Sequence, residues 1–257
     1  MTRPNSENIC FTTTAMPRPE LLVKTYASFK QHLPWLDLKK CPLFINVDYF
    51  PHYYEDHAQR VQSVIDIAKE YFGEVTANIQ ERGNFPAAVK WIFSNVNREF
   101  VFNLEDDWEL LCDIPEYVAS FFDDPKIIQV GFRAWKKSDP RFVLSPSILK
   151  ASFCHKVAAE MHTKRNPEWQ IRGLNPYKVE ESFIYWPYED DKIILRDLGR
   201  TWMKDTPFAR GLDTWTSWEF VPNVIIRARE QLIQDQNIEI DISKLDGNFR
   251  GKDVPNN

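Results

Sequence analysis

The residues of this 257-residue chain best suited to chemistry are three consecutive acids, Glu105, Asp106 and Asp107. They follow Glu99–Leu104, an apolar and aromatic run typical of a buried β-strand. Crowded carboxylates repel one another unless a cation is shared between them. Mg²⁺ or Mn²⁺, bound by one or two carboxylates and by substrate phosphates, would relieve that repulsion. The pattern predicts a divalent cation site among these carboxylates.

The elements around these acids alternate between strand-like and helix-like segments. Strands are expected over residues 9–13, 43–48, 74–80, 99–104, 127–132 and 142–149, and helices over the segments that start near residues 19, 61, 84, 114 and 153. Asn84 is expected to cap the third of these helices. This alternation predicts an α/β fold with a largely parallel sheet covered by helices on both faces, and a less regular half after residue 133. Because ligands bind beyond the carboxyl ends of such strands, a ligand site is favoured over a merely solvated acidic loop or helix N-terminus.

The layout resembles that of GT-A-fold, Rossmann-like glycosyltransferases, whose metal-binding acidic motif closes the fourth strand. Glu105-Asp106-Asp107 would be that motif, and the continuation through Trp108–Leu110 and Ile114–Tyr117 resembles the matching segment of N-acetylglucosaminyltransferases. Thr12–Pro19 resembles the first nucleotide-binding loop of these enzymes. The resemblance covers residues 8–132, and the order and spacing of the motifs carry it.

The resemblance implies a set of residues that bind a nucleotide-sugar donor. They are Thr13, Thr14, Arg18, Asp48, Arg82, Asn84, Glu105 and Asp106. Asp48 ends the second strand, where the fold contacts the nucleobase, and Arg82-Gly83-Asn84 forms the loop that touches the nucleotide or the sugar. A cation on Asp107 as leading ligand, helped by Asp106 or Glu105, would neutralise the charge that develops on the diphosphate leaving group. Arg18 or Arg82 would add a fixed positive charge. For either arginine, a surface salt bridge is the competing interpretation.

Positive charge is concentrated between residues 133 and 172. This segment holds nine Lys or Arg and three Asp or Glu, a local charge of about +6 within a chain of net charge -5. Such a segment can hold a diphosphate, a phosphorylated acceptor or a nucleic-acid backbone, although a solvated basic face gives the same count. With the tryptophans of the same half, it predicts acceptor contacts at Trp135, Lys136, Lys137, Trp169 and Arg172.

Glu168 is the first candidate for a general base, because it stands beside Trp169 on what is expected to be a polar loop. In an inverting transferase, a carboxylate takes the proton of the acceptor hydroxyl as that hydroxyl attacks the anomeric carbon. Asp191 and Glu181 are the other catalytic candidates, with Glu180 and Asp190 next to them. A retaining enzyme would need no base of this kind.

Composition excludes several classes of protein. The hydrophobic fraction of 43% and charged fraction of 27% are those of a globular chain, and no apolar run is long enough to cross a membrane. The four cysteines, Cys10, Cys41, Cys112 and Cys154, show no CxxC spacing, which indicates reduced thiols rather than a zinc site. With no visible signal peptide, a cytoplasmic protein is expected.

We therefore expect a GT-A-like domain over residues 1–222, with a nucleotide-sugar half (1–132) and an acceptor half (133–222), followed by a helical extension and tail (223–257). The expected activity is transfer of a sugar, with Mn²⁺ or Mg²⁺, from a UDP-sugar or related donor to a saccharide or glycolipid. One alternative is a phage-type DNA glycosyltransferase acting on a hydroxymethylated or already glycosylated base. The other is a nucleotidyltransferase or a non-catalytic nucleotide-sugar-binding module.

Overall fold

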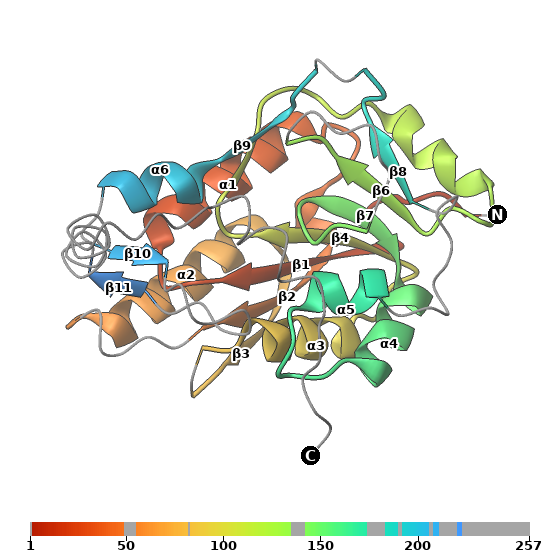
Figure 1. The fold of residues 1–257 in the computed structure, drawn as a ribbon. Helices are drawn as coiled ribbons and strands as arrows, with labels where there is room; N and C mark the ends of the chain where they lie inside the picture. The colour runs from red at the N-terminus through yellow and green to blue at the C-terminus, as the bar shows by residue number, and fades with distance from the viewer. Residues whose placement is uncertain are drawn as a thin grey trace, which may run out of the picture.

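A seven-stranded sheet in the order β3-β2-β1-β4-β7-β6-β8 forms the centre of the molecule (Figure 1). The computed structural model describes residues 2–48, 55–81, 83–134, 142–173, 183–189, 192–205, 208–210 and 220–222. The strands of the sheet are β1 (Ile9–Ala15), β2 (Pro42–Val47), β3 (Glu74–Ile79), β4 (Phe100–Glu105), β6 (Gln129–Phe132), β7 (Ser147–Lys150) and β8 (Phe183–Trp186). All neighbours pair in parallel except β7, which is antiparallel to both β4 and β6. The expected α/β fold with a mostly parallel sheet is confirmed.

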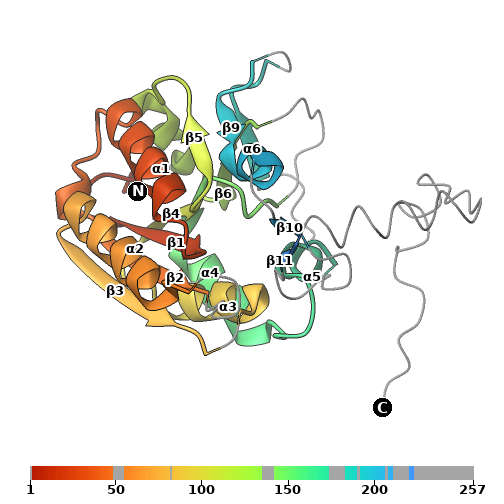
Figure 2. The same ribbon diagram turned by 90° about the vertical axis from the view of Figure 1, so that its left-hand side faces the viewer.

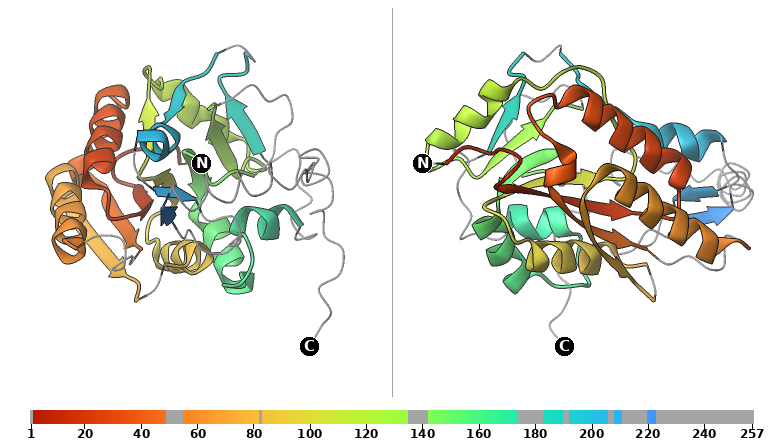
Figure 3. Two further views of the ribbon diagram at one scale, coloured as in Figure 1. Left: turned by 60° about the vertical axis from the view of Figure 1, so that its left-hand side comes forward. Right: turned by 180° about the vertical axis from the view of Figure 1, so that it is seen from behind.

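Helices cover both faces of this sheet. Two of them, α1 (Pro19–His32) and α2 (His57–Tyr71), lie on one face, and α3 (Phe85–Asn95) and α4 (Ala151–Glu160) lie on the other (Figures 2 and 3). The shorter helices are η1 (Leu38–Lys40), η2 (Glu116–Asp123), α5 (Pro167–Gly173) and α6 (Leu198–Asp205). Two small two-stranded sheets complete the described elements. One pairs β5 (Trp108–Leu110) with β9 (Leu195–Asp197), and the other pairs β10 (Phe208–Arg210) with β11 (Phe220–Pro222). Within the described residues, no helix has the length and apolar character needed to cross a membrane.

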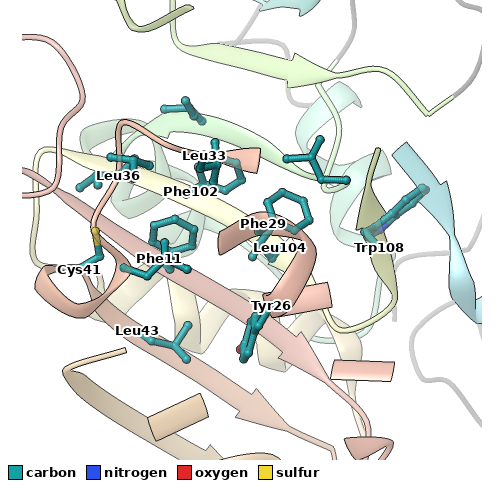
Figure 4. Packing of buried hydrophobic residues seen from close by; sticks show 14 of the residues in the cluster. Phe11, Tyr26, Phe29, Leu33, Leu36, Cys41, Leu43, Phe102, Leu104 and Trp108 are labelled. Atoms are coloured by element: carbon teal, nitrogen blue, oxygen red, sulfur yellow. The ribbon is translucent and has the colours of Figure 1, made fainter. Parts of the chain in front are cut away.

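The two faces of the sheet are buried in separate hydrophobic clusters. In β1, Phe11 enters the cluster under α1 and α2, whereas its neighbour Cys10 enters the cluster under α3 and α4. Phe11 stacks on Phe102 of β4 with ring centroids 4.9 Å apart, and Phe29 of α1 meets Phe102 edge-on at 5.6 Å (Figure 4). Because strand side chains alternate between faces, strands that are apolar at every position must be covered on both sides.

The strand expected over residues 142–149 is shorter than predicted, because β7 begins only at Ser147. Side chains rather than a neighbouring strand bind the preceding backbone. The Gln129 amide donates to the Val143 carbonyl oxygen at 2.7 Å and accepts from its N–H at 3.1 Å. The expectation of a polar loop at residues 166–172 is also wrong, since α5 begins at Pro167, a residue whose fixed φ suits a first helical position.

Candidate active site

The carboxyl ends of β1, β2 and β4 bring the predicted donor-binding residues together. In the β1–β4 register Thr14 lies opposite Glu105, and the hydrogen bonding continues past the strand because the Asp106 N–H donates to the Thr14 carbonyl oxygen at 3.1 Å. On the other side of β1, the Asp48 N–H donates to the Ala15 carbonyl oxygen at 2.9 Å. Parallel pairing therefore sets Asp48 and the acidic motif at one edge of the sheet.

Asp106 is buried in an ion pair with Arg18. The Arg18 guanidinium donates through Nη2 to Asp106 Oδ1 at 2.7 Å and through Nε to Oδ2 at 3.1 Å, and the Met16 N–H also reaches Oδ2 at 3.1 Å. Burial raises the pKa of Asp106 to about 6 despite the opposing charge of Arg18, so the carboxylate is still ionised at neutral pH. Both carboxylate oxygens of Asp106 thus have protein partners.

Asp107 is held between Arg18 and the first turn of α6. Its Oδ2 accepts a second bond from Arg18 Nη2 at 3.0 Å, and the side chain is 22% exposed, against 4% for that of Asp106. The Leu198 N–H donates to the Asp107 carbonyl oxygen at 2.8 Å. A Cβ atom placed on Gly199 would lie 2.2 Å from Asp107 Oδ2, so a side chain at position 199 would displace the Asp107 carboxylate.

Glu105 is bound by Trp108 and lies within electrostatic range of Glu168. Its Oε2 accepts a hydrogen bond from Trp108 Nε1 at 2.7 Å. Burial, followed by the charges of Asp107 and Glu168, raises the pKa of Glu105 well above its usual value. Glu168 lies on α5, where its Oε1 accepts from the Leu144 N–H at 2.8 Å. The predicted base is therefore within electrostatic reach of the acidic motif.

Asp48 is buried beside polar side chains. Asn46 Nδ2 donates to Asp48 Oδ1 at 3.0 Å, and Asn78 Nδ2 donates to Asn46 Oδ1 at 2.7 Å. Burial and the charge of Asp106 raise the pKa of Asp48 to about 7, while hydrogen bonds from Asn46 and from the Asn84 backbone oppose the rise. The Asp48 carboxyl therefore takes up or releases a proton near neutral pH.

The other predicted donor residues within the described part have structural partners. Thr13 is buried, and its hydroxyl accepts from Tyr26 Oη at 3.0 Å. Thr14 is half-buried at the end of β1. Asn84 caps α3, as expected from the sequence, by accepting from the Ala87 N–H at 2.9 Å, and its Nδ2 donates to the Thr163 carbonyl oxygen at 3.2 Å.

Several predicted residues lie outside what the structure describes. Arg82, Trp135, Lys136, Lys137, Glu180, Glu181, Asp190 and Asp191 and the extension over residues 223–257 fall in the undescribed segments. Trp169 and Arg172 lie on α5, and only their backbone is described.

Two residues of the site, Gly199 and Trp202, were not predicted to lie beside Arg18 and the acidic motif. The Arg18 guanidinium carbon lies 5.1 Å from the centroid of the Trp202 ring, a cation–π arrangement. Trp202 Nε1 donates to Glu20 Oε1 at 3.2 Å. The only signal in the sequence is a helix-compatible run with glycine and tryptophan three residues apart, which is too common to identify a site.

Comparison with known proteins supports a fold assignment. No family model and no curated protein matches the sequence. Among solved structures, the mannosyltransferase PcManGT from Pyrobaculum calidifontis, in complex with GDP-Man and Mn²⁺, is similar over 74% of this chain and 58% of that chain, at 10% identity and a TM-score of 0.51. S. aureus TarS is similar over 73% of this chain and 36% of that chain, at 10% identity and a TM-score of 0.50. This chain has a GT-A-like α/β fold.

A third solved structure, a cytidylyltransferase from Leptospira borgpetersenii, is similar over 90% of this chain and 95% of that chain, but its TM-score of 0.46 is too low to carry an argument. At 10% identity, the likeness to PcManGT and TarS concerns the fold alone. The chain also spans less than two thirds of either of those proteins, 58% and 36%. The activity must therefore be argued from the site itself.

The GT-A-like site has oxygen donors that suit a hard divalent cation. Among the residues that the structure describes, no three His, Cys, Asp or Glu side chains are grouped as a metal site. Mg²⁺ is often held by one or two carboxylates with substrate phosphates, and the partly exposed Asp107 beside Glu105 offers such a set. Burial and then the charge of Asp107 raise the pKa of Glu105, and a bound cation would favour its ionised form. These residues fit a divalent cation.

Proposed function

We propose that this protein is a metal-dependent glycosyltransferase that moves a sugar from a nucleotide-sugar to an acceptor hydroxyl. The observation that carries the proposal is the convergence of Asp48, Arg18 and the acidic motif at the carboxyl ends of β1, β2 and β4 in a GT-A-like fold. Ligands of open α/β sheets bind at this edge. The mannosyltransferase with the similar fold was solved with a nucleotide-sugar and Mn²⁺, which agrees with this choice of donor and cofactor.

On the donor side, Asp48 is the proposed nucleotide contact, with Thr13, Thr14, Arg82 and Asn84 as further donor contacts. A UDP-sugar is the first donor to test. Arg18 is buried and permanently charged, since Asp106 and Asp107 raise its pKa further. It supplies a fixed positive charge where the diphosphate leaves, and fixed charges act without reorganisation during the reaction.

Asp107 is the proposed principal ligand of the cation, with Glu105 beside it. When bound, Mg²⁺ or Mn²⁺ would neutralise the charge that the diphosphate gains on leaving. Asp106 is a weaker candidate than Asp107 because both of its oxygens are already bonded, to Arg18 and to the Met16 N–H. In this proposal the role of Asp106 is to orient Arg18.

On the acceptor side, Glu168 is the proposed base of an inverting reaction. The acceptor oxygen attacks the anomeric carbon, the bond from that carbon to the diphosphate breaks, and Glu168 takes the hydroxyl proton. The bond from the Leu144 N–H fixes one carboxylate oxygen, as a base of defined orientation requires. Asp191 and Glu181 are the alternative bases, and Trp135, Lys136, Lys137, Trp169 and Arg172 are the proposed acceptor contacts.

The direct test is a screen of nucleotide-sugars with Mn²⁺ by thermal unfolding, because a ligand that binds the native state raises the melting temperature. The stabilising donor is then incubated with saccharide acceptors and the products are identified. Release of a nucleoside diphosphate supports sugar transfer. Release of pyrophosphate would instead identify a nucleotidyltransferase, and stabilisation without any product would identify a binding module.

Three variants test the assigned roles. Asp107→Ala and treatment with EDTA should each abolish transfer, and Glu168→Gln should lower kcat by about 10²–10⁴-fold with little change in donor affinity. Asp66→Ala, an exposed carboxylate on α2, is the matched control and should retain activity. Full activity of Asp107→Ala in EDTA would refute the cation assignment.

The acceptor is tested separately, because the basic segment over residues 133–172 also permits DNA. We expect transfer to a saccharide or glycolipid. Binding to hydroxymethylated DNA that falls steeply with salt and requires Lys136 and Lys137 would instead favour the DNA acceptor.

A further inference from the structure

Arg18 is enclosed on two sides by acids and on a third by an indole. Its Nη2 atom is shared between Asp106 Oδ1 at 2.7 Å and Asp107 Oδ2 at 3.0 Å. The Trp202 ring covers the guanidinium at 5.1 Å. Only 5% of the Arg18 side chain is exposed. The guanidinium therefore already provides a positive charge within hydrogen-bond distance of the proposed ligand Asp107.

The contact to Asp107 differs from the contact to Asp106. Asp106 binds Arg18 through two oxygens and two nitrogens, whereas Asp107 accepts a single bond through an atom that Arg18 also uses for Asp106. Bidentate pairs are stronger and more directional than single contacts. A cation that approached Asp107 could therefore take over Oδ2 while Arg18 stayed paired with Asp106.

Trp202 is anchored independently of the acidic motif. Its Nε1 donates to Glu20 Oε1 at 3.2 Å, and Glu20 Oε2 pairs with Arg60 of α2 at 3.2 Å. The first turn of the same helix, α6, touches Asp107 through Gly199 and Leu198. Figure 1 shows α6 at the end of the sheet toward which β1 points, and Figure 2 shows β5 between α6 and α1. One helix thus contacts both Asp107 and the arginine paired with it.

We propose that Trp202 is a positioning residue that holds Arg18 on Asp107, so that Arg18 and a divalent cation compete for the Asp107 carboxylate. The inference rests on the proposed function, because it takes Asp107 as the cation ligand. It adds that the cation binds by replacing Arg18 as the partner of Asp107 Oδ2. Arg18 gives up Asp107 Oδ2, retains Asp106, and its released N–H becomes available to a diphosphate oxygen of the donor.

The competition between Arg18 and the cation predicts a tighter binding of Mn²⁺ when Trp202 is removed, whereas a general loosening of the site does not. Replacing Trp202 by Leu removes the cation–π contact, weakens the hold of Arg18 on Asp107, and should tighten Mn²⁺ binding by about threefold to tenfold. Trp202→Phe keeps an aromatic face and should restore most of the wild-type affinity. A purely structural role for Trp202 would leave Mn²⁺ binding unchanged or weaker in Trp202→Leu.

The experiment is titration of the full chain with Mn²⁺ alone, followed by electron paramagnetic resonance of the free ion, and then repeated with UDP. Trp91→Leu, a half-buried tryptophan of α3, is the matched control and should bind Mn²⁺ like the wild type. Asp107→Asn should abolish the binding and so identify the site.

Unchanged or weaker Mn²⁺ binding by Trp202→Leu would overturn the exchange while leaving the transferase proposal intact. Absence of Mn²⁺ binding by the wild type, with or without UDP, would also overturn it. The transferase proposal is decided by the reaction products of the wild type, which do not depend on this titration.

Discussion

Replacing Asp48 by Asn should stabilise the protein in alkaline solution, although it removes a proposed nucleotide contact. The Asp48 carboxyl is buried, and burial together with the charge of Asp106 raises its pKa from 3.8 to about 7. Because the folded state holds this proton more tightly than the unfolded state, ionising Asp48 favours unfolding. Asn has nearly the same shape, cannot ionise, and keeps an oxygen that can accept the hydrogen bond from Asn46.

The magnitude follows from the size of the pKa change. The pKa of Asp48 rises by about three pH units, and at about 1.4 kcal/mol per pH unit the ionised carboxylate costs about 4 kcal/mol. The cost is absent below the unfolded pKa of 3.8, grows as the pH rises, and is complete above about 7. The stability of Asp48→Asn relative to the wild type should therefore rise by about 2–3 kcal/mol between about pH 5 and about pH 8.5.

The assay is urea unfolding of both proteins at the two pH values, followed by tryptophan fluorescence. The control is Asp66→Asn, at an exposed position, which measures how the free energy of unfolding changes when a surface carboxylate is lost. A free-energy difference between Asp48→Asn and the wild type that does not grow with pH would refute the assigned burial of this charge. So would a variant that is less stable than the wild type at the higher pH.

Three further perturbations test the fold around the site. Asn84→Ala removes the side chain that accepts from the Ala87 N–H at the start of α3, and should lower the free energy of unfolding by about 1 kcal/mol in urea, whereas no loss would contradict the cap. Phe11→Ala empties a fully buried position stacked on Phe102, and should cost about 3–5 kcal/mol in the same assay. Native-state alkylation followed by mass spectrometry should label the half-buried Cys112 before the buried Cys10 and Cys154, because a buried thiol is less accessible to the reagent; equal labelling would contradict the burial of Cys10 and Cys154.

The fold of residues 1–132 could be predicted because its local signals agree with its tertiary environment. The strands β1, β2 and β4 combine apolar residues with a few Thr and Asn, and the structure buries both of their faces. The Asn84 cap was predicted from the same local chemistry that the structure shows. The placement of Asp48 and Asp107 then followed from strand direction, because parallel strands end at one edge of the sheet.

The partners of these residues could not be predicted, because they depend on distances that sequence spacing does not encode. Nothing local indicates that Arg18 pairs with Asp106 rather than with solvent, or that Trp202 covers it. The strand expected at residues 142–149 failed for a related reason, since the side chain of Gln129 satisfies the Val143 backbone in place of a strand. Periodicity describes which face of an element is apolar, but it does not identify a polar side chain that substitutes for a neighbouring strand.

The ion pair and the tryptophan contact also determine when the site comes into existence during synthesis. Arg18 and Asp106 are 88 residues apart in sequence, and Trp202 and Glu20 are 182 residues apart. Contacts between such distant residues carry a loop-closure cost and form late in folding. On the ribosome, the central sheet can pair β1 with β4 before α6 has emerged, but Arg18 then lacks its indole cover. Ligand binding at the complete site would consequently distinguish chains that include α6 from chains that fold but end before it.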